Sequence, residues 1–267
     1  MAEFTGSRGK IHYGHWSPPE PEALVVFFHG LGEHIGSYQP LADALTGAGF
    51  AFWAHDHAGH GHSDGERVLI ESVDDLLADA ATLVGLAREA HPGLPLVLAG
   101  HSLGATVATL LVGEGRLPDH PKALVLAGSS LVPDISGGLV NLLASGIDPW
   151  ELRKDPGELT RHPSYAQQIR DDPLTWQGGL RLETLGALGE AAPRVSAVLP
   201  KIDLPVLLLH GADDDLAPAA GALKAAELLP DARAVVFPDD RHNILNELDR
   251  DDVHRVFAEF AAEHVRG

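Results

Sequence analysis

One serine flanked by glycines constrains the fold of this chain more than any other feature. Gly100-His101-Ser102-Leu103-Gly104 follows the apolar run 94–99 and precedes the helix-like run 105–111. A strand that turns into a helix at one residue strains that residue's backbone, and side chains two positions away would collide with neighbouring elements. Glycines at both of those positions therefore predict a strand–turn–helix unit that exposes the Ser102 hydroxyl at a helix N-terminus, a nucleophile elbow.

Apolar runs alternate with helix-like segments along most of the chain. Residues 3–16 indicate a hairpin that turns near Gly9, and further strands are expected over 23–28, 50–54, 94–99, 123–127, 206–209 and 234–237. Helices are expected over 38–47, 73–90, 105–111, 219–229 and 251–265. This alternation predicts an α/β fold with a mostly parallel eight-stranded sheet flanked by helices.

The alternation stops between residues 131 and 199. No strand-like run occurs there, and glycines and prolines separate short amphipathic pieces such as 139–143 and 165–169. A helical cap inserted into one sheet domain explains this pattern, because the last two strands need the first six as neighbours. We therefore expect a core of residues 1–130 and 200–267 with a cap of residues 131–199.

Composition limits the chemistry and the partners. The 267 residues contain no cysteine, which excludes disulfides and thiolate catalysis. The net charge of −19, from 19 basic and 38 acidic side chains, disfavours nucleic acid and anionic lipid as partners. Residues 1–10 have no apolar secretory segment and the apolar runs are too short to span a bilayer, so a cytoplasmic protein is expected. Peripheral contact of the cap with a membrane stays open, and the sequence does not indicate an oligomeric state.

Two later loops offer partners for the serine. A serine hydroxyl needs a general base, and the base needs a third group to orient it. Asp213, Asp214 and Asp215 follow the strand 206–209, and His242 follows the strand 234–237. The order Ser, Asp, His is that of α/β-hydrolases, and strand ends of this kind meet at one edge of the sheet. Spacing alone leaves all three aspartates open.

Two other histidines compete with His242 for the role of base. His210 lies at a strand end, where a structural role is expected, and His254 lies inside the final helix, where we expect it on the surface. The oxyanion hole is expected to use the backbone N–H groups of Leu103, directly after the nucleophile, and of Leu31, after the strand 23–28.

Two further patterns suggest cofactor sites but lack necessary parts. His55, His57, His60 and His62 resemble a metallohydrolase motif, yet Gly59 stands where that motif needs an aspartate. Gly30-Leu31-Gly32 resembles a dinucleotide fingerprint, yet bulky residues 33–35 occupy the place where a pyrophosphate would approach the backbone. We therefore expect neither a metal nor an organic cofactor.

Several segments together resemble the monoacylglycerol lipases of the α/β-hydrolase superfamily. They are residues 29–34 (HGLGEH), 56–65 (DHAGHGHSDG), 100–104, 170–174, 210–214 and 242–247. The resemblance implies Ser102 as nucleophile, Asp214 as acid and His242 as base, with Leu31 and Leu103 as oxyanion donors. It also implies that Glu33 lies near the alcohol end of the pocket.

The chain departs from this family pattern at two positions. Ser37 stands where relatives often have a basic residue, and Ala58 stands where an arginine is common. The first departure bears on how a glycerol group would be held. The second lies in the loop around Asp56, which we expect to brace the site without taking part in the chemistry.

These observations lead to an expected function. The chain is expected to be a cofactor-free serine ester hydrolase that cleaves monoacylglycerols to fatty acid and glycerol through an acyl-enzyme. A general carboxylesterase or lysophospholipase on the same triad is the alternative, and a non-catalytic ligand-binding module is a third. Apolar cap residues are expected to line an acyl tunnel or touch lipid, with ordinary cap packing left open: Leu139, Val140, Leu142, Leu143 and Ile147.

Overall fold

An eight-stranded sheet forms the centre of the molecule, in the order β1-β2-β4-β3-β5-β6-β7-β8. The computed structural model describes residues 2–132 and 146–266. The strands are β1 (Ala2–Gly6), β2 (Gly9–Trp16), β3 (Ala23–Phe28), β4 (Phe50–His55), β5 (Leu96–His101), β6 (Ala123–Ala127), β7 (Val206–Gly211) and β8 (Ala232–Phe237). Within the described sheet, the β1–β2 and β2–β4 pairs are antiparallel and the other five pairs are parallel. The predicted fold class is therefore confirmed.

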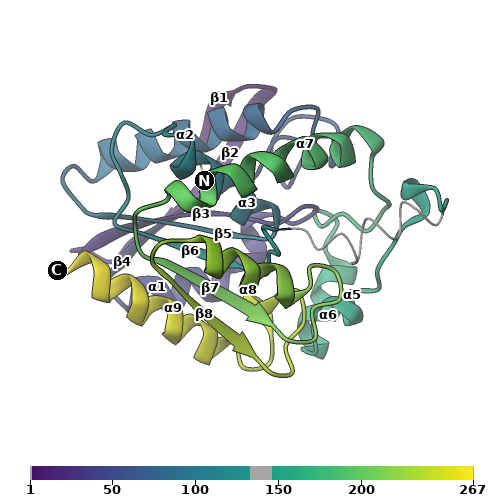
Figure 1. Cartoon of the computed structure of the whole chain (residues 1–267). Helices are drawn as coiled ribbons and strands as arrows, with labels where there is room; N and C mark the ends of the chain where they lie inside the picture. Colours follow the sequence, from purple (N-terminus) through teal and green to yellow (C-terminus); the bar gives the residue numbers. More distant parts are fainter. Residues whose placement is uncertain (1, 133–145, 267) are drawn as a thin grey trace.

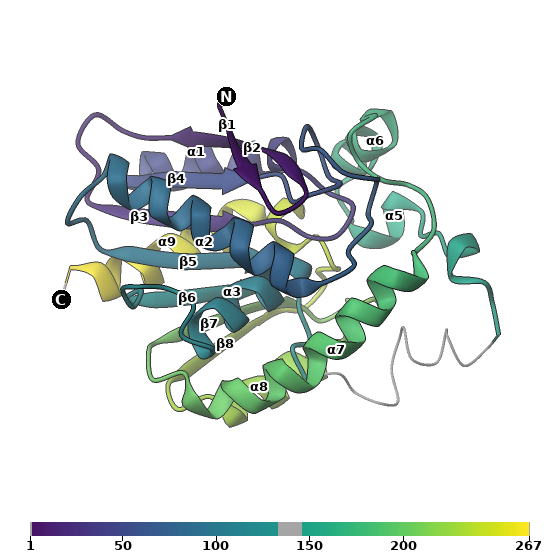
Figure 2. The same ribbon diagram turned by 90° about the horizontal axis from the view of Figure 1, so that it is seen from above.

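Helices cover both faces of this sheet (Figures 1 and 2). They include α1 (Gln39–Gly47), α2 (Val73–Ala90), α3 (Leu103–Gly113), α8 (Ala219–Leu228) and α9 (Arg250–Val265), with short 3-10 turns η1 (Ile35–Tyr38), η3 (Leu199–Lys201) and η4 (Ile244–Asn246). On β3, Val25 and Phe27 pack toward α1 and α9, whereas Leu24, Val26 and Phe28 pack toward α2 and α3. Burial on both faces explains why these strands are continuously apolar.

In its described part, the segment between β6 and β7 is helical and contains no strand. Its helices are η2 (Pro149–Glu151), α5 (Pro156–Leu159), α6 (Pro163–Asp171) and α7 (Leu182–Val198). Figure 1 shows α5 and α6 at the end of the sheet toward which β7 and β8 point. The 17-residue helix α7 is longer than the short amphipathic pieces expected there. It packs against α3, because Ala187, Ala191 and Val195 are buried in the same apolar cluster as the α3 side chains.

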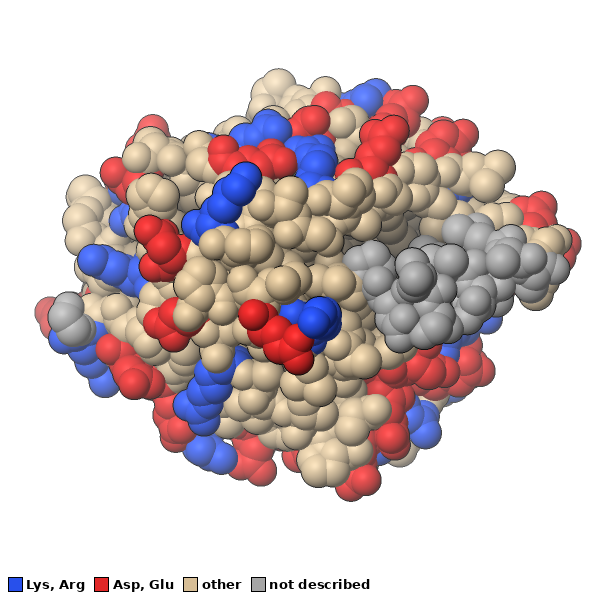
Figure 3. Space-filling view, viewed as in Figure 1, with Lys and Arg blue, Asp and Glu red and all other residues tan. Residues whose placement is uncertain are grey.

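Elements of the core lie within two residues of their expected positions. Among the described residues, no helix is both long enough and apolar enough to span a bilayer. On the face shown in Figure 3, acidic and basic side chains are interspersed around the molecule. The negative net charge is therefore not gathered into one patch on this face.

Candidate active site

The turn between β5 and α3 has the strained geometry that its sequence predicts. Ser102 has φ 51° and ψ −113°, in the left-handed region that residues with side chains avoid. A Cβ on Gly100 would overlap the carbonyl of Gly104, and a Cβ on Gly104 would overlap the carbonyl of Phe28. The Ser102 N–H donates to the Ala127 carbonyl at 2.9 Å, which ties the turn to β6. These contacts hold the hydroxyl at the N-terminus of α3.

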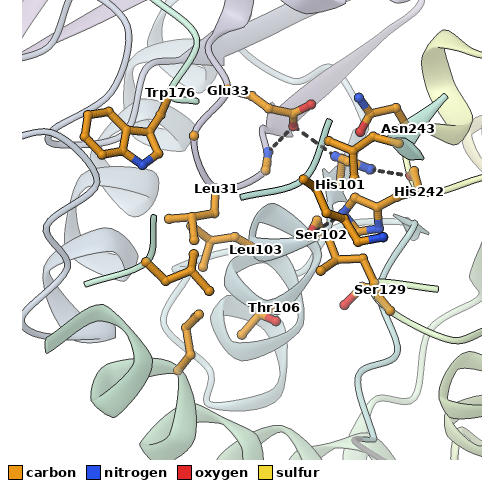
Figure 4. A pocket seen from close by; sticks show the side chains of 18 of the residues that line it. Leu31, Glu33, His101, Ser102, Leu103, Thr106, Ser129, Trp176, His242 and Asn243 are labelled. Carbon is orange, nitrogen blue, oxygen red and sulfur yellow. Dashed lines mark hydrogen bonds and ion pairs between the residues drawn. The ribbon is translucent and has the colours of Figure 1, made fainter. Parts of the chain in front are cut away.

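Ser102, His242 and Asp214 form one hydrogen-bonded chain. His242 Nε2 lies 3.1 Å from Ser102 Oγ, and His242 Nδ1 lies 2.9 Å from Asp214 Oδ2. Since a carboxylate only accepts hydrogen bonds, Nδ1 carries the proton and Nε2 is free to accept one from the serine. The structure therefore brings together the three side chains expected from the sequence. Figure 4 shows two of them, Ser102 and His242, side by side at the cavity.

The loop after β7 distinguishes Asp214 from its neighbours. Asp214 is buried and its Oδ1 accepts hydrogen bonds from the N–H groups of Leu216 and Ala217, at 3.0 and 2.8 Å. Asp213 and Asp215 are exposed. Burial alone would raise the pKa of Asp214, but His242 and hydrogen bonds from His210 and the backbone hold that pKa well below its usual value. Asp214 is therefore ionised at neutral pH.

The two competing histidines have structural contacts. His210 Nε2 lies 2.6 Å from the Ala217 carbonyl and 3.2 Å from Asp214 Oδ2. His254 is buried, and its Nε2 lies 2.8 Å from the Leu245 carbonyl. The expectation of a surface position for His254 is wrong, because the face of α9 that carries it packs onto η4.

A buried network connects the β3–η1 loop with the loop of His242. Glu33 Oε2 accepts hydrogen bonds from the Gly30 N–H at 2.9 Å and the Tyr38 hydroxyl at 2.5 Å, and lies 3.0 Å from His101 Nδ1. His101 Nε2 donates to the His242 carbonyl at 2.9 Å. Burial alone would raise the pKa of Glu33, but His101 and Tyr38 lower it to about 2. Burial opposes protonation of His101, yet the Glu33 carboxylate raises its pKa.

This network was not expected from the sequence. Nothing in the local pattern links Glu33 to His101, because 68 residues separate them. Its effect is to connect the backbone of His242 with the loop that carries Leu31. Glu33, which the family resemblance places near the alcohol end of the pocket, lines the same cavity as Ser102.

A cavity of about 370 Å³ opens over Ser102. Leu31 and Leu103, the expected oxyanion donors, line it, as do Glu33, Ser37 and His242. The remaining wall comes largely from α6, α7 and the segment between them: Tyr165, Ile169, Thr175, Trp176, Gln177, Leu180, Leu185, Leu188, Ala191, Ala192 and Val195. Sequence reasoning missed the α7 residues, although their spacing of three to four residues along 185–195 is a helical signal.

The expected acyl-tunnel residues give no further information on this wall. Leu139, Val140, Leu142 and Leu143 lie outside the described residues. Ile147 is 45% exposed and does not belong to the described residues that line the cavity.

Four histidines beside the site form a buried cluster. His29, His55, His57 and His60 are at most 2% exposed, and their rings lie 4.2 to 6.1 Å apart in pairs. No group of three or more metal-ligating side chains within 2–132 and 146–266 has the geometry of a metal site. In the adjacent loop, Asp56 accepts hydrogen bonds from the N–H groups of Ile35 and His62, each at 2.8 Å, which supports the expected bracing role.

Comparison with known proteins gives consistent matches across the chain. The family model described as serine aminopeptidase, S33, matches residues 19–249. A monoacylglycerol lipase of Mycolicibacterium smegmatis is 33% identical over 91% of this chain and 90% of its own length. The human monoglyceride lipase is 33% identical over 80% of this chain and 73% of its own length.

Solved structures agree with the sequence matches. The crystal structure of Paleococcus ferrophilus monoacylglycerol lipase is 29% identical, with a TM-score of 0.78 over 95% of this chain and 99% of that one. A soluble variant of the Saccharomyces cerevisiae monoglyceride lipase, solved with a substrate analog, has a TM-score of 0.86 over 99% and 95% of the two chains. At 19% identity, this second likeness concerns the fold alone.

Proposed function

The chain belongs to the serine aminopeptidase S33 family and is a carboxylic ester hydrolase similar to monoacylglycerol lipases, and from this we propose that it cleaves monoacylglycerols to fatty acid and glycerol. The observation that carries the proposal is the hydrogen-bonded chain from Asp214 through His242 to Ser102 at the floor of a largely apolar cavity. That cavity suits an acyl chain, and its floor carries an activated hydroxyl.

The first half of the reaction forms an acyl-enzyme. Ser102 Oγ attacks the ester carbonyl carbon while its proton passes to His242 Nε2, 3.1 Å away. Asp214 keeps His242 in the tautomer that can accept this proton and stabilises the imidazolium that results. The bond from the carbonyl carbon to the glycerol oxygen then breaks, and the glycerol oxygen takes the proton from His242.

The second half releases the fatty acid. A water gives a proton to His242 and attacks the acyl carbon, after which Ser102 leaves and regains its proton. The backbone N–H groups of Leu31 and Leu103 stabilise the oxyanion in both halves, a contribution of about 3 to 4 kcal/mol for each donor in related chemistry.

Charge at one end of the cavity favours an alcohol with free hydroxyl groups. Glu33 lines the cavity, and its pKa of about 2 keeps it ionised at neutral pH. A carboxylate oxygen at the cavity wall accepts hydrogen bonds from hydroxyl donors. We therefore place the glyceryl group beside Glu33.

We further propose that residues 131–199 act as a cap inserted into a core of residues 1–130 and 200–267. Support comes from α6 and α7, which supply much of the cavity wall while the core supplies Ser102, Asp214 and His242. Acyl chains would therefore lie between cap and core.

A substrate panel tests the proposed function. It spans monoacylglycerols of several chain lengths, the matching lysophospholipids and short soluble esters. Preference for monoacylglycerols supports the proposal, whereas turnover of short esters alone favours a general carboxylesterase. Labelling by a fluorophosphonate should be lost in Ser102→Ala, and a wild-type chain that is not labelled would exclude catalysis by Ser102 and favour a ligand-binding module.

A further inference from the structure

The segment after α6 reaches back onto the loop that carries Leu31. Asp172 Oδ2 lies 2.7 Å from His34 Nε2, and the Trp176 N–H donates to the Gly32 carbonyl at 2.7 Å. The first contact joins residues 138 positions apart, and the second contacts the residue directly after Leu31. Figure 4 shows Trp176 next to Leu31 and Glu33.

The hydrogen bond between His34 and Asp172 has a defined direction. His34 Nδ1 accepts from the Gly36 N–H at 3.2 Å, so the ring proton lies on Nε2 and is donated to Asp172. The other Asp172 oxygen accepts from the Leu174 N–H at 2.9 Å. Burial opposes ionisation, but the hydrogen bonds from Leu174 and His34 hold the pKa of Asp172 below its usual value. The hydrogen bonds to Gly36 and Leu174 therefore orient His34 and Asp172 toward each other.

Trp176 covers the same loop. Gly32 has φ +78°, and a Cβ at this position would lie 3.3 Å from the Trp176 Cβ. Outside this segment, Asp56 accepts a hydrogen bond from the Ile35 N–H at 2.8 Å. Within the loop, Glu33 accepts from the Gly30 N–H at 2.9 Å and is itself fixed by Tyr38 and His101. The loop of residues 30–35 is therefore held by Asp56, Tyr38 and His101 and, in addition, by the segment 172–176.

We propose that His34 and Asp172 are positioning residues that hold the Leu31 N–H in the oxyanion hole. The inference rests on the proposed function, because it concerns the same reaction. An oxyanion donor acts only when it lies about 2.7 to 3.1 Å from the oxygen of the tetrahedral intermediate. A loop released on one side loses this placement while the serine, histidine and aspartate stay where they are.

The test compares His34→Ala with His34→Gln on a monoacylglycerol. In His34→Ala, we expect kcat to fall at least tenfold with KM changed less than threefold. Affinity for an alkyl trifluoromethyl ketone, whose bound oxygen occupies the oxyanion hole, should fall by the same factor as kcat/KM. Glutamine can donate to Asp172, so His34→Gln should recover most of the rate.

Thr184→Val, in α7, is the matched control for loss of hydrogen bonds between residues far apart in the chain. The Thr184 hydroxyl donates to the Val68 carbonyl at 2.6 Å and accepts from the Ile70 N–H at 3.0 Å, away from the loop of residues 30–35. We expect this variant to lower the melting temperature but to leave kcat and ketone affinity unchanged. If Thr184→Val and His34→Ala lower kcat equally, the contact stabilises the fold only and the proposal is overturned.

Two further outcomes separate this proposal from the proposed function. Unchanged kcat and ketone affinity in His34→Ala, with normal wild-type turnover, would refute the positioning role alone. A wild-type chain that hydrolyses no ester would refute the proposed function, and the positioning role with it. Asp172→Ala combined with His34→Ala should lower kcat no further than either single change, since both remove one interaction.

Discussion

Because of its buried histidine cluster, we expect the protein to lose stability in mild acid. The contribution of His55 to the free energy of unfolding can be measured separately. Its ring is 0% exposed, packs against Phe4 and Phe28, and within the described parts of the chain neither of its nitrogens has a hydrogen-bond partner. Burial lowers the pKa of His55 from 6.5 to about 3. The ring therefore stays neutral in the folded protein at any pH near neutrality.

The sign and the size of the effect follow from linkage. Below pH 6.5 the unfolded chain binds a proton at His55 that the folded chain does not bind, so stability falls as pH falls. With 1.36 kcal/mol for each pH unit, the free energy of unfolding loses about 2 kcal/mol from this residue at pH 5, and about 0.2 kcal/mol at pH 7. His29, His57 and His60 act in the same direction, because burial lowers their pKa values as well.

His55→Phe removes this titration while keeping an aromatic ring. Urea unfolding followed by tryptophan fluorescence at pH 7 and pH 5 should show the variant losing about 2 kcal/mol less than the wild type between these values. His120→Phe makes the same change at an exposed position and is the control for the substitution itself. If His55→Phe loses as much stability as the wild type, the reasoning from burial is refuted.

Three further changes test other parts of the structure. Asp214→Asn should lower kcat roughly 10³- to 10⁴-fold with little change in KM, because the amide no longer selects the productive His242 tautomer; steady-state kinetics on a monoacylglycerol measures this. Gly104→Ala should destabilise the fold by more than about 3 kcal/mol, since its Cβ would overlap the Phe28 carbonyl; a melting temperature close to wild type would contradict this. Arg161→Ala should cost about 3 to 5 kcal/mol of unfolding free energy in urea titrations, because Asp240 and Glu247 are fully buried beside that guanidinium. That loss of unfolding free energy should grow from pH 6 to pH 9. Burial raises the pKa of Asp240 to about 7, so its carboxylate becomes charged in this range, and in the variant this buried charge has no Arg161 beside it.

The amino-acid sequence by itself determined the strands, the core helices and the elbow, because steric constraints within a few residues fix each of them. An apolar run of five or six residues bounded by turn residues has few other conformations in which it can be buried, and β3 through β7 lie within two residues of their expected positions. The elbow is equally local, because Gly100 and Gly104 lie two residues from Ser102 and any side chain there meets the backbone. Such constraints act over a few residues and can be read without knowledge of the fold.

Only the tertiary structure decided which distant groups meet. Spacing left three aspartates open, and the turn after β7 buries Asp214 against His242 while Asp213 and Asp215 face solvent. The burial of His254 and the contact of Asp172 with His34 depend on packing between elements far apart in sequence. A side chain's partner depends on where chain crossovers bring other elements, and no local pattern encodes that distance.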